Sequence, residues 1–383
     1  MSAGSSRIAD HMERQASAAH LKHTNIGIVG LGIIGRGIAA HLRGKCFPVF
    51  VWNRSPRPVP NFVGSLGELL QLCSYIQIFV SDDEALLQTV EQLREKLTSR
   101  HVILAHSTVA PDSMRAAAET VESRGAQFVE ACFTGSKGAA EKGELIYYVG
   151  GTDDAVRQAR PVLEASSKEI VRIGAVGQAS AIKIATNMVT AATVQAAAEA
   201  LALLQAQGLS LDKFMEAMRV NASYSGTLAM KLPKMLSRDF EPHFSVKHMF
   251  KDMQIATQLA LANYLDLGVT AAARDQLGEQ MQWGHGDQDY SAVLRKYLYE
   301  PAPGFYEEPQ QPETHEATGT QEVVGSPAEA PAENPPVEQI GVVVSQQSLL
   351  TLSGTITAAT PVDAPVRRGF LRQLLSRFSS GPE

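Results

Sequence analysis

The feature that most constrains the fold is a glycine motif that directly follows a short apolar run. The apolar run is Ile26-Gly27-Ile28-Val29, and the motif reads Gly30-Leu31-Gly32-Ile33-Ile34-Gly35. The residues after the motif have the apolar spacing of a helix, so the order is strand, tight turn, helix. In that order the first glycine permits the turn, the second admits a diphosphate close to the backbone, and the third lets helix and strand pack closely. The motif therefore predicts a dinucleotide at the start of this helix, although a glycine-rich structural turn would have the same letters.

The end of the next expected strand, 49–52, indicates which dinucleotide binds. A site that prefers NAD carries Asp or Glu there, about 20 residues past the glycines, to accept a hydrogen bond from the ribose 2′-OH. This chain has Asn53, Arg54 and Ser55 instead, and all three can donate to a phosphate. We therefore expect NADP(H) as the cofactor. A surface arginine that contacts only water, or one that stacks on adenine in either cofactor, would leave the preference open.

Composition and charge exclude several classes of protein. The 383 residues are 44% hydrophobic and 19% charged with a net charge of −6, which is typical of a globular protein and not of a general nucleic-acid binder. Cys46, Cys73 and Cys132 are too few and too scattered for a disulfide framework or a zinc site, so we expect no metal. We see no secretory signal and no apolar run clean enough to be an integral membrane segment. A cytoplasmic protein that binds no nucleic acid is expected.

Strands and helices alternate over residues 25–177, which predicts a Rossmann-type α/β domain with a parallel sheet and helices on both faces. The expected strands are 26–29, 49–52, 76–80, 102–105, 127–130 and 146–149. Expected helices include 84–97 and 112–123. The second crossover contains Pro56, Pro58 and Pro60, which lack N–H groups and restrict the residues before them. A loop is expected there, followed by a short helix over 65–72.

Residues 178–300 are expected to form an all-helical substrate and dimerisation domain. A long helix over 178–207 is followed by helical patterns at 211–220, 227–236, 245–265 and 271–283. The stretch 191–204 is so apolar that it should be buried on most sides, and one chain of this size cannot easily bury it alone. We therefore expect a homodimer, or a tetramer, that forms through the helical domain.

The two ends of the chain have a different composition. Residues 1–24 are polar and are expected to be flexible. Residues 301–383 begin with a Pro/Glu-rich stretch that has too few apolar groups to offset the entropy of ordering, so we expect a disordered tail. The tail closes with a basic amphipathic segment, 367–378, which could dock on a partner, on its own domain or on anionic lipid, or remain a transient helix.

Two groups of polar residues near the change from sheet to helices could carry chemistry. Thr134, Gly135 and Ser136 follow a strand and offer hydroxyls and close-set N–H groups that can hold a carboxylate, although an ordinary loop has the same composition. Lys183 and Asn187 are four residues apart and share one face of the long helix. A lysine held out of water there has a lowered pKa and can donate a proton to a carbonyl oxygen. A lysine that reaches solvent along the helix would have no such role.

Over about residues 25–298 the chain resembles the β-hydroxyacid dehydrogenase family, which includes 3-hydroxyisobutyrate dehydrogenases and glyoxylate/succinic semialdehyde reductases. The resemblance is carried, in order, by the segments 30–35, 52–55, 107–111, 134–136, 174–187, 251–253 and 286–292. It implies a Rossmann domain, a helical domain that makes the dimer, and an active site in the cleft between them. Hydride would pass between the nicotinamide of NADP(H) and the carbonyl or hydroxyl carbon of a small carboxylic acid, such as glyoxylate, succinic or tartronate semialdehyde, or 3-hydroxyisobutyrate.

The resemblance also implies roles for single residues. Lys183 would be the acid in reduction and the base in oxidation, and Asn187 would orient the reacting oxygen. Thr134, Gly135 and Ser136 would bind the substrate carboxylate, with Lys183, Asn187 and Lys251 also touching substrate. The cofactor contacts that it adds to the glycine motif and to residues 53–55 are Val80, Ser107, Thr108 and Lys251.

Within the family, Gly135-Ser136-Lys137 and Asn187-Met188 are most similar to the glyoxylate/succinic semialdehyde reductases. The chain departs from the family at Cys132 and Phe133, where the usual residues are Pro and Val, so the bulkier ring should reshape the pocket. Two other functions stay open. One is an imine reductase, although those relatives typically replace the lysine with Asp or Tyr. The other is a catalytically impaired NADP-binding scaffold that acts through its tail.

Overall fold

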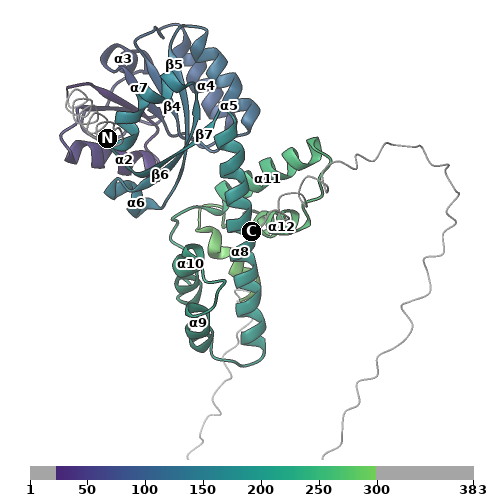
Figure 1. The fold of residues 1–383 in the computed structure, drawn as a ribbon. Helices are drawn as coiled ribbons and strands as arrows, with labels where there is room; N and C mark the ends of the chain where they lie inside the picture. The colour runs from purple at the N-terminus through teal and green to yellow at the C-terminus, as the bar shows by residue number, and fades with distance from the viewer. Residues whose placement is uncertain (1–22, 299–383) are drawn as a thin grey trace, which may run out of the picture. The chain divides into compact units, whose positions relative to one another are not determined.

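The structure is a computed structural model and describes residues 23–298. These residues lie within one compact unit, Met1–Glu308, and form a seven-stranded sheet followed by a group of helices (Figure 1). The strands are β1 Ile26–Val29, β2 Val49–Trp52, β3 Tyr75–Ile78, β4 Val102–Ala105, β5 Gln127–Thr134, β6 Leu145–Gly151 and β7 Ser167–Gly174. The helices beside the sheet are α2 Ile33–Gly44, α3 Leu66–Leu72, α4 Asp83–Arg94, α5 Pro111–Glu122, α6 Lys137–Lys142 and α7 Asp153–Glu164.

The strand order across the sheet is β2-β1-β3-β4-β5-β6-β7. Strand β1 lies between β2 and β3, and Ile26 pairs in parallel with both Val49 and Tyr75. The expected parallel Rossmann-type sheet is confirmed from β2 to β5. Because parallel strands end at the same edge, the glycine motif after β1 meets the residues that follow β3 and β4.

Strand β6 departs from that expectation because it runs antiparallel to β5, with Thr134 opposite Ile146. The connection between the two strands contains only the six-residue helix α6. A parallel crossover needs a dozen or more residues, so a connection this short returns the chain in the opposite direction. Strand β7 then pairs with β6 in parallel. The sequence did not predict β7, because it is a half-exposed edge strand in which charged residues interrupt the apolar pattern.

Both faces of the sheet are covered by helices (Figure 1). One hydrophobic core contains side chains of α3, α4 and α5, and the other contains side chains of α2, α6 and α7. Strands β1 and β4 are buried over their whole length because the helices cover them on both sides. Helices α6 and α7 were not among the expected helices; α6 is a single short element, and Pro161 lies inside α7.

The proline-rich crossover has no helix until α3, as expected. Residues 61–63 instead lie along the outer edge of β2, where the Val63 N–H donates to the Val51 carbonyl at 2.9 Å. A bridge joins Val51 and Phe62. The segment thus covers a strand edge that would otherwise present unpaired backbone groups.

The second part of the described chain is helical, as expected. It contains α8 Gln178–Ala206, α9 Leu211–Arg219, α10 Gly226–Leu236, α11 Val246–Ala262, α12 Gly268–Gln282 and the 3-10 helix η1 Tyr290–Tyr297. Side chains of these elements form one hydrophobic core. The 3-10 helix was not expected, and the remaining bounds agree with the sequence patterns to within a few residues.

Helix α8 is 29 residues long and apolar enough, by length and composition, to cross a membrane. A buried helix of a globular core passes the same test. Lys183, Asn187 and Gln195 of α8 are buried and hydrogen-bonded to other side chains. Charged and amide groups inside a bilayer are costly, so these contacts favour a core helix. The expectations for residues 1–24 and 301–383 fall almost entirely outside the described residues.

Candidate active site

The glycine motif forms the turn that the sequence predicts. Gly30 has φ +94°, and a Cβ at this residue would overlap the carbonyl oxygen of Phe79. A Cβ at Gly35 would overlap the carbonyl oxygen of Gly30. At Gly32, by contrast, a Cβ would meet no atom within 4 Å. Two of the glycines therefore serve packing within the protein, while Gly32 leaves room on the open side of the turn for a ligand to approach the backbone of α2.

Asn53 holds this turn from the neighbouring strand. Its Oδ1 accepts from the Leu31 N–H at 2.9 Å, and its Nδ2 donates to the Ser55 carbonyl at 2.8 Å. Both ends of the amide are thus engaged with the backbone. Of the three residues expected to donate to a phosphate, Arg54 and Ser55 have exposed side chains, and Asn53 shapes the glycine turn.

The start of α8 is anchored by a carboxylate from the sheet. Its N-cap residue, Gly177, has φ +89° and no side chain to cap the helix. The carboxylate of Glu130 on β5 accepts from the N–H groups of Gly177 at 2.7 Å, Ala179 at 3.3 Å and Ser180 at 2.5 Å. These are groups that a helix start leaves unpaired. Burial raises the pKa of Glu130, although these hydrogen bonds favour its charged form. Glu130 therefore fixes the start of α8 against the sheet.

Lys183 lies less than two turns further along α8 and is buried, with 9% of its surface exposed. Its Nζ donates to Oδ1 of Asn187 at 2.9 Å, so the two predicted catalytic residues are in contact. The Nδ2 of Asn187 donates in turn to Oδ2 of Asp252 at 2.6 Å. Burial lowers the pKa of Lys183, and the charge of Asp252 opposes part of that shift. The arrangement gives an ammonium group with spare donors and a weakened hold on its proton.

Asp252 also contacts the second lysine of the predicted site. Its Oδ1 accepts from Nζ of Lys251 at 2.7 Å, and Asp252 itself is fully buried. The same Nζ donates to the carbonyl oxygen of Thr108, which lies after β4. Lys251 therefore reaches from the helical region to the edge of the sheet where the glycine motif lies.

A cavity of about 450 Å³ lies between the glycine turn and the first turns of α11. The predicted site residues that line it are Gly32, Ile33, Ile34, Gly35, Val80, Ser107, Thr108, Gly135 and Lys251. Lys183 and Asn187 are not among the residues that line it, but Asn187 contacts Asp252, which is. Thr134 and Ser136 flank Gly135 at the end of β5 and the N-cap of α6. Arg54 and Ser55 are not among its lining residues.

Several residues at the cavity were missed in the sequence. Phe79 and His106 are two of these, and they stack with ring centroids 4.3 Å apart. Phe133, which the sequence did single out, lies 6.3 Å from Phe79. Burial lowers the pKa of His106 to about 4, so this ring is neutral and serves as part of an aromatic wall. His106 directly precedes the Ser107-Thr108 segment, which is a signal that could have located it. Asp252 could have been located by its position directly after Lys251, within an otherwise apolar stretch.

Cys132 and Phe133 have separate environments. Cys132 is buried, and its Sγ lies 3.5 Å from the Ser107 carbonyl and 3.7 Å from the Ser180 hydroxyl. Burial raises the pKa of this thiol, with a further contribution from Glu130, so it is not a reactive thiolate. Phe133 instead points to the cavity, which it lines. Any reshaping of the pocket would therefore come from Phe133 and not from Cys132.

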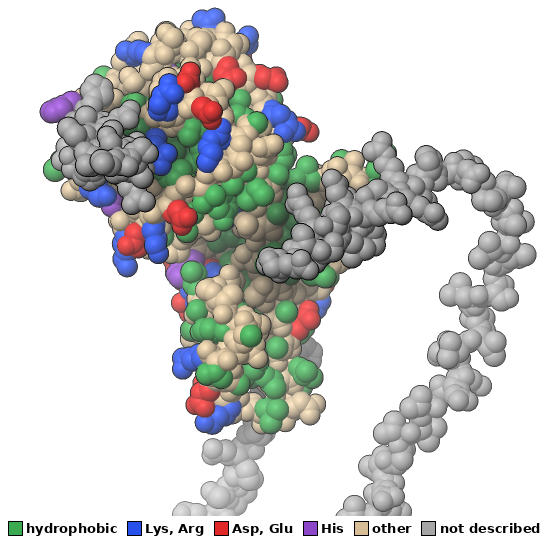
Figure 2. Space-filling model, in the orientation of Figure 1, with side chains coloured by type: hydrophobic (Ala, Val, Ile, Leu, Met, Phe, Trp, Pro, Cys, Tyr) green, Lys and Arg blue, Asp and Glu red, His purple; other side chains and the backbone are tan. Residues whose placement is uncertain are grey.

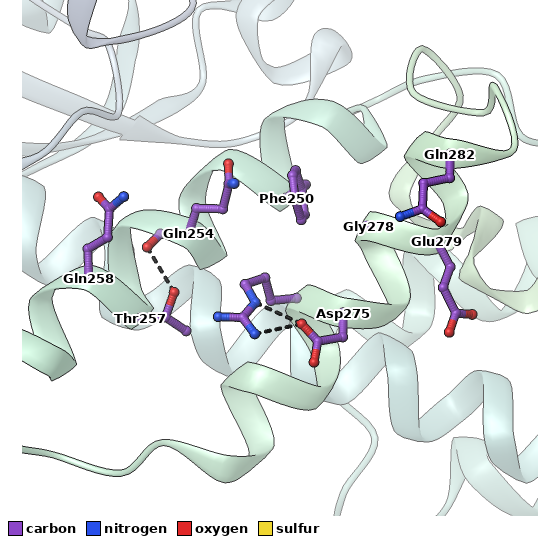
Figure 3. A pocket seen from close by; sticks show the side chains of 9 residues that line it. Phe250, Gln254, Thr257, Gln258, Asp275, Gly278, Glu279 and Gln282 are labelled. Carbon is purple, nitrogen blue, oxygen red and sulfur yellow. Dashed lines mark hydrogen bonds and ion pairs between the residues drawn. The ribbon is translucent and has the colours of Figure 1, made fainter.

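A second cavity, of about 560 Å³, lies between α11 and α12 and shares no residue with the first (Figure 3). Its side chains are mostly polar and include three glutamines and the ion pair between Arg274 and Asp275, at 2.7 Å. Phe250 packs there against Gly278, where a Cβ would come within 3.2 Å of the ring. None of the residues predicted to bind cofactor or substrate lies in this groove.

Both the sheet region and the helical region of the chain match models of known protein families. Residues 25–174 match the family model for the NAD-binding domain of 6-phosphogluconate dehydrogenase. Residues 177–297 match the model described as NAD-binding of NADP-dependent 3-hydroxyisobutyrate dehydrogenase.

Individual relatives cover the same part of the chain. Glyoxylate/succinic semialdehyde reductase 1 of Arabidopsis thaliana is 29% identical over 279 residues, which are 70% of this chain and 96% of the relative. The cytokine-like nuclear factor N-PAC of Anopheles gambiae is 28% identical, over 73% of this chain and 51% of that protein. The structure of 3-hydroxyisobutyrate dehydrogenase from Mycobacterium tuberculosis with L-serine has a TM-score of 0.63 at 25% identity, covering 71% of this chain and 98% of the other. The chain belongs to the β-hydroxyacid dehydrogenase family.

Proposed function

We propose that the chain is an NADPH-dependent reductase of small aldehyde or keto acids, or the reverse dehydrogenase, with Lys183 as the general acid and base. The observation that carries the proposal is the buried chain of contacts from Lys183 through Asn187 and Asp252 to Lys251, which reaches the cavity beside the glycine turn. Glyoxylate, succinic semialdehyde and tartronate semialdehyde are the substrates of choice for a first test, with 3-hydroxyisobutyrate for the reverse direction.

The residues of the cavity fit a nicotinamide dinucleotide. Gly32 leaves open space in front of the first turn of α2, where free N–H groups favour a phosphate. Val80, Ser107, Thr108 and Lys251 line the adjoining wall, where the nicotinamide end would lie. When bound, the reduced cofactor supplies the hydride that the chain's own side chains cannot.

The protein's part of the reaction is to hold the acid and to deliver a proton. Gly135, with the hydroxyls of Thr134 and Ser136 beside it, would bind the substrate carboxylate. Asn187 fixes the Lys183 ammonium through its Oδ1. Lys183 does not line the cavity, so the mechanism requires the substrate's carbonyl oxygen to come within hydrogen-bond reach of its Nζ. There Lys183 would donate its proton to that oxygen as it gains negative charge, because burial already disfavours the charged amine. In the oxidative direction the neutral amine would take the proton back.

The preference for NADP(H) is part of the proposal. Strand β2 ends without a carboxylate, and Arg54 follows with an exposed guanidinium beside the Asn53 that shapes the turn. A 2′-phosphate could be held bidentately by such a group, whereas a free ribose hydroxyl would have no carboxylate to accept its hydrogen bond.

A second copy of the chain is the expected macromolecular partner. Along α8 the exposed side chains include Ile182 at 42%, Val189 at 69% and Leu203 at 63%. Hydrophobic side chains are visible over the helical part of the molecule in Figure 2. An apolar stripe of this kind favours a homodimer or tetramer through the helical region. We keep the cytoplasm as the expected compartment, since all three cysteines are unpaired.

The test is NADPH oxidation with the three aldehyde acids, for the parent chain and for Lys183→Met. We expect turnover with at least one substrate and a loss of about 10³-fold in the variant, because general acid catalysis typically contributes this much. The affinity for NADPH should stay within about threefold, because Lys183 is not among the residues that line the cavity. Lys213→Met is the matched control, since Lys213 is an exposed lysine of α9 that pairs with Glu216.

A runner-up is supported by the similarity to N-PAC, which its name describes as a nuclear factor rather than as a reductase. In that case the chain would bind the cofactor and act without turnover. Tight NADPH binding without oxidation on the whole panel, in the parent chain, would favour this scaffold and contradict the reductase.

A further inference from the structure

The charges on the cavity surface are distributed unevenly between its two walls. Among the described residues, every lining residue from the sheet side is uncharged, including the neutral His106. The charged side chains all come from the helical region, and they are Lys247, Lys251, Asp252 and Asp287. A dinucleotide carries two negative charges on its diphosphate. The glycine turn can offer that group only backbone N–H donors.

Lys247 is the basic residue at the outer part of this wall. It lies in the first turn of α11, four residues before Lys251, and its side chain is 48% exposed. Its Nζ pairs with Oδ1 of Asp287 at 2.5 Å, and the Asp287 side chain is 88% exposed. Exposed pairs of this kind are weak. A competing anion in the cavity can therefore take over the ammonium group at little cost.

His248 stands beside Lys247 on the same wall. Its Nδ1 is 2.6 Å from the Ser245 hydroxyl, and that hydroxyl makes no capping bond to the start of α11. Ser245 is thus used to orient the ring, which also stacks on Phe244 with centroids 5.9 Å apart. No described residue hydrogen-bonds its Nε2, so this nitrogen can face a ligand. Burial lowers the pKa of His248, Lys251 and Lys247 lower it further, and Asp252 and Asp287 oppose the shift. The ring is therefore neutral near pH 7 and can donate from Nε2 when Ser245 donates to Nδ1.

We propose that Lys247 and His248 bind the diphosphate of the cofactor from the helical side, opposite the glycine turn. The assignment rests on the proposed function, since it presumes a dinucleotide in this cavity. Lys247 supplies the counter-charge that the sheet side lacks, and His248 supplies a hydrogen bond. The bound cofactor would then connect the sheet region and the helical region through its diphosphate. This connection is independent of the contact between Lys251 and Thr108.

The experiment compares equilibrium dissociation constants for four ligands, which are NADPH, NADH, 2′-phospho-ADP-ribose and 2′-AMP. Lys247→Gln should raise the dissociation constants of the first three ligands by about tenfold, as expected for one lost charge-assisted contact. The affinity for 2′-AMP should not change, because that fragment has no diphosphate. His248→Leu should weaken the same three by about threefold, and His248→Gln should restore part of the loss because its amide can also donate. Lys213→Gln is the control for the loss of one exposed positive charge.

Asp287→Asn gives a prediction of the opposite sign. The change removes a negative charge from the cavity wall and releases Lys247, so NADPH and 2′-phospho-ADP-ribose should bind about two- to fivefold more tightly. Equal affinities of Lys247→Gln and the parent chain for 2′-phospho-ADP-ribose would overturn the proposal. So would weakening of 2′-AMP by the same factor. Failure of the parent chain to bind NADPH at all would instead refute the proposed function, so the two failures can be told apart.

Discussion

The two walls of the cavity use different chemistry. The sheet side contributes a glycine turn, backbone groups and an aromatic wall, whereas the helical side contributes every charged group that lines the cavity within residues 23–298. The shape of the sheet side depends on close packing. A single methyl group at Gly30 or Gly35 would overlap a backbone oxygen. The helical side is set by hydrogen bonds between charged and amide groups around Asp252. We infer that the first wall provides shape and the second provides charge.

The largest expected loss of stability comes from the residue that anchors α8 of the helical region to the sheet. Glu130→Ala would leave the buried N–H groups of Gly177, Ala179 and Ser180 without their acceptor. We expect the free energy of unfolding to fall by about 4 kcal/mol, since each buried donor left unpaired costs about 1–3 kcal/mol and some will find water. Chemical denaturation of the parent and the variant measures this. Glu122→Ala, at an exposed glutamate of α5, is the control. A loss no greater than that of the control would show that Glu130 does not anchor α8.

Two glycine substitutions test whether the sheet side acts through shape. Gly35→Ala should destabilise the fold by about 3 kcal/mol, because the new methyl group would overlap the Gly30 carbonyl. Gly32→Ala should leave stability unchanged, because its methyl group meets no protein atom, and should weaken NADPH by about tenfold or more. Thermal unfolding and NADPH titration of both variants give the comparison. Equal stability losses in the two variants would contradict the division of roles between these glycines.

Asp252→Asn tests whether the helical side acts through charge. The amide keeps the shape of the side chain but removes the charge that faces Lys251 and that raises the pKa of Lys183. We expect kcat/KM to fall by about 100-fold, with the high-pH limb of the rate profile shifted to lower pH, since Lys183 would then lose its proton more readily. Steady-state kinetics across pH measure both effects. An unchanged profile would mean that the charge of Asp252 does not reach Lys183.

The smallest expected effect concerns the cofactor preference. Arg54→Ala should weaken the binding of NADPH by about 1–3 kcal/mol and leave the binding of NADH nearly unchanged, because only NADPH has a 2′-phosphate. Titration with each cofactor gives the two affinities, and Arg57→Ala, another exposed arginine three residues away, is the control. Equal weakening of both cofactors by Arg54→Ala would place the guanidinium on the adenine ring instead.

Local sequence patterns were enough to predict much of the sheet side. Strands β1, β2 and β4 have the expected bounds, because each is an apolar run that ends at a glycine or polar signal. Strands β6 and β7 were harder, since the direction of β6 depends on a short connection and the charged residues of β7 hide its apolar pattern.

The site could be predicted only in part. Lys183 and Asn187 were singled out by their spacing on one helix face together with the family resemblance, and they are in contact at 2.9 Å. Their contact with Asp252 joins residues 65 positions apart, which no local pattern can reveal. The same holds for Glu130 at the start of α8 and for the stacking of Phe79 on His106. Their residue types were visible in the sequence, but only the tertiary fold gives them partners.

The proposed mechanism requires the buried amine of Lys183 to give up the proton during reduction. The most direct measurement is the pH dependence of single-turnover NADPH oxidation, with cofactor deuterated at the transferred position to show that the chemical step is observed. We expect a rate that falls as pH rises through a pKa below the usual lysine value, because burial favours the neutral amine. Lys183→Met should lose this limb. A rate that stays constant between about pH 6 and about pH 10, with the isotope effect present, would show that Lys183 is not the proton donor.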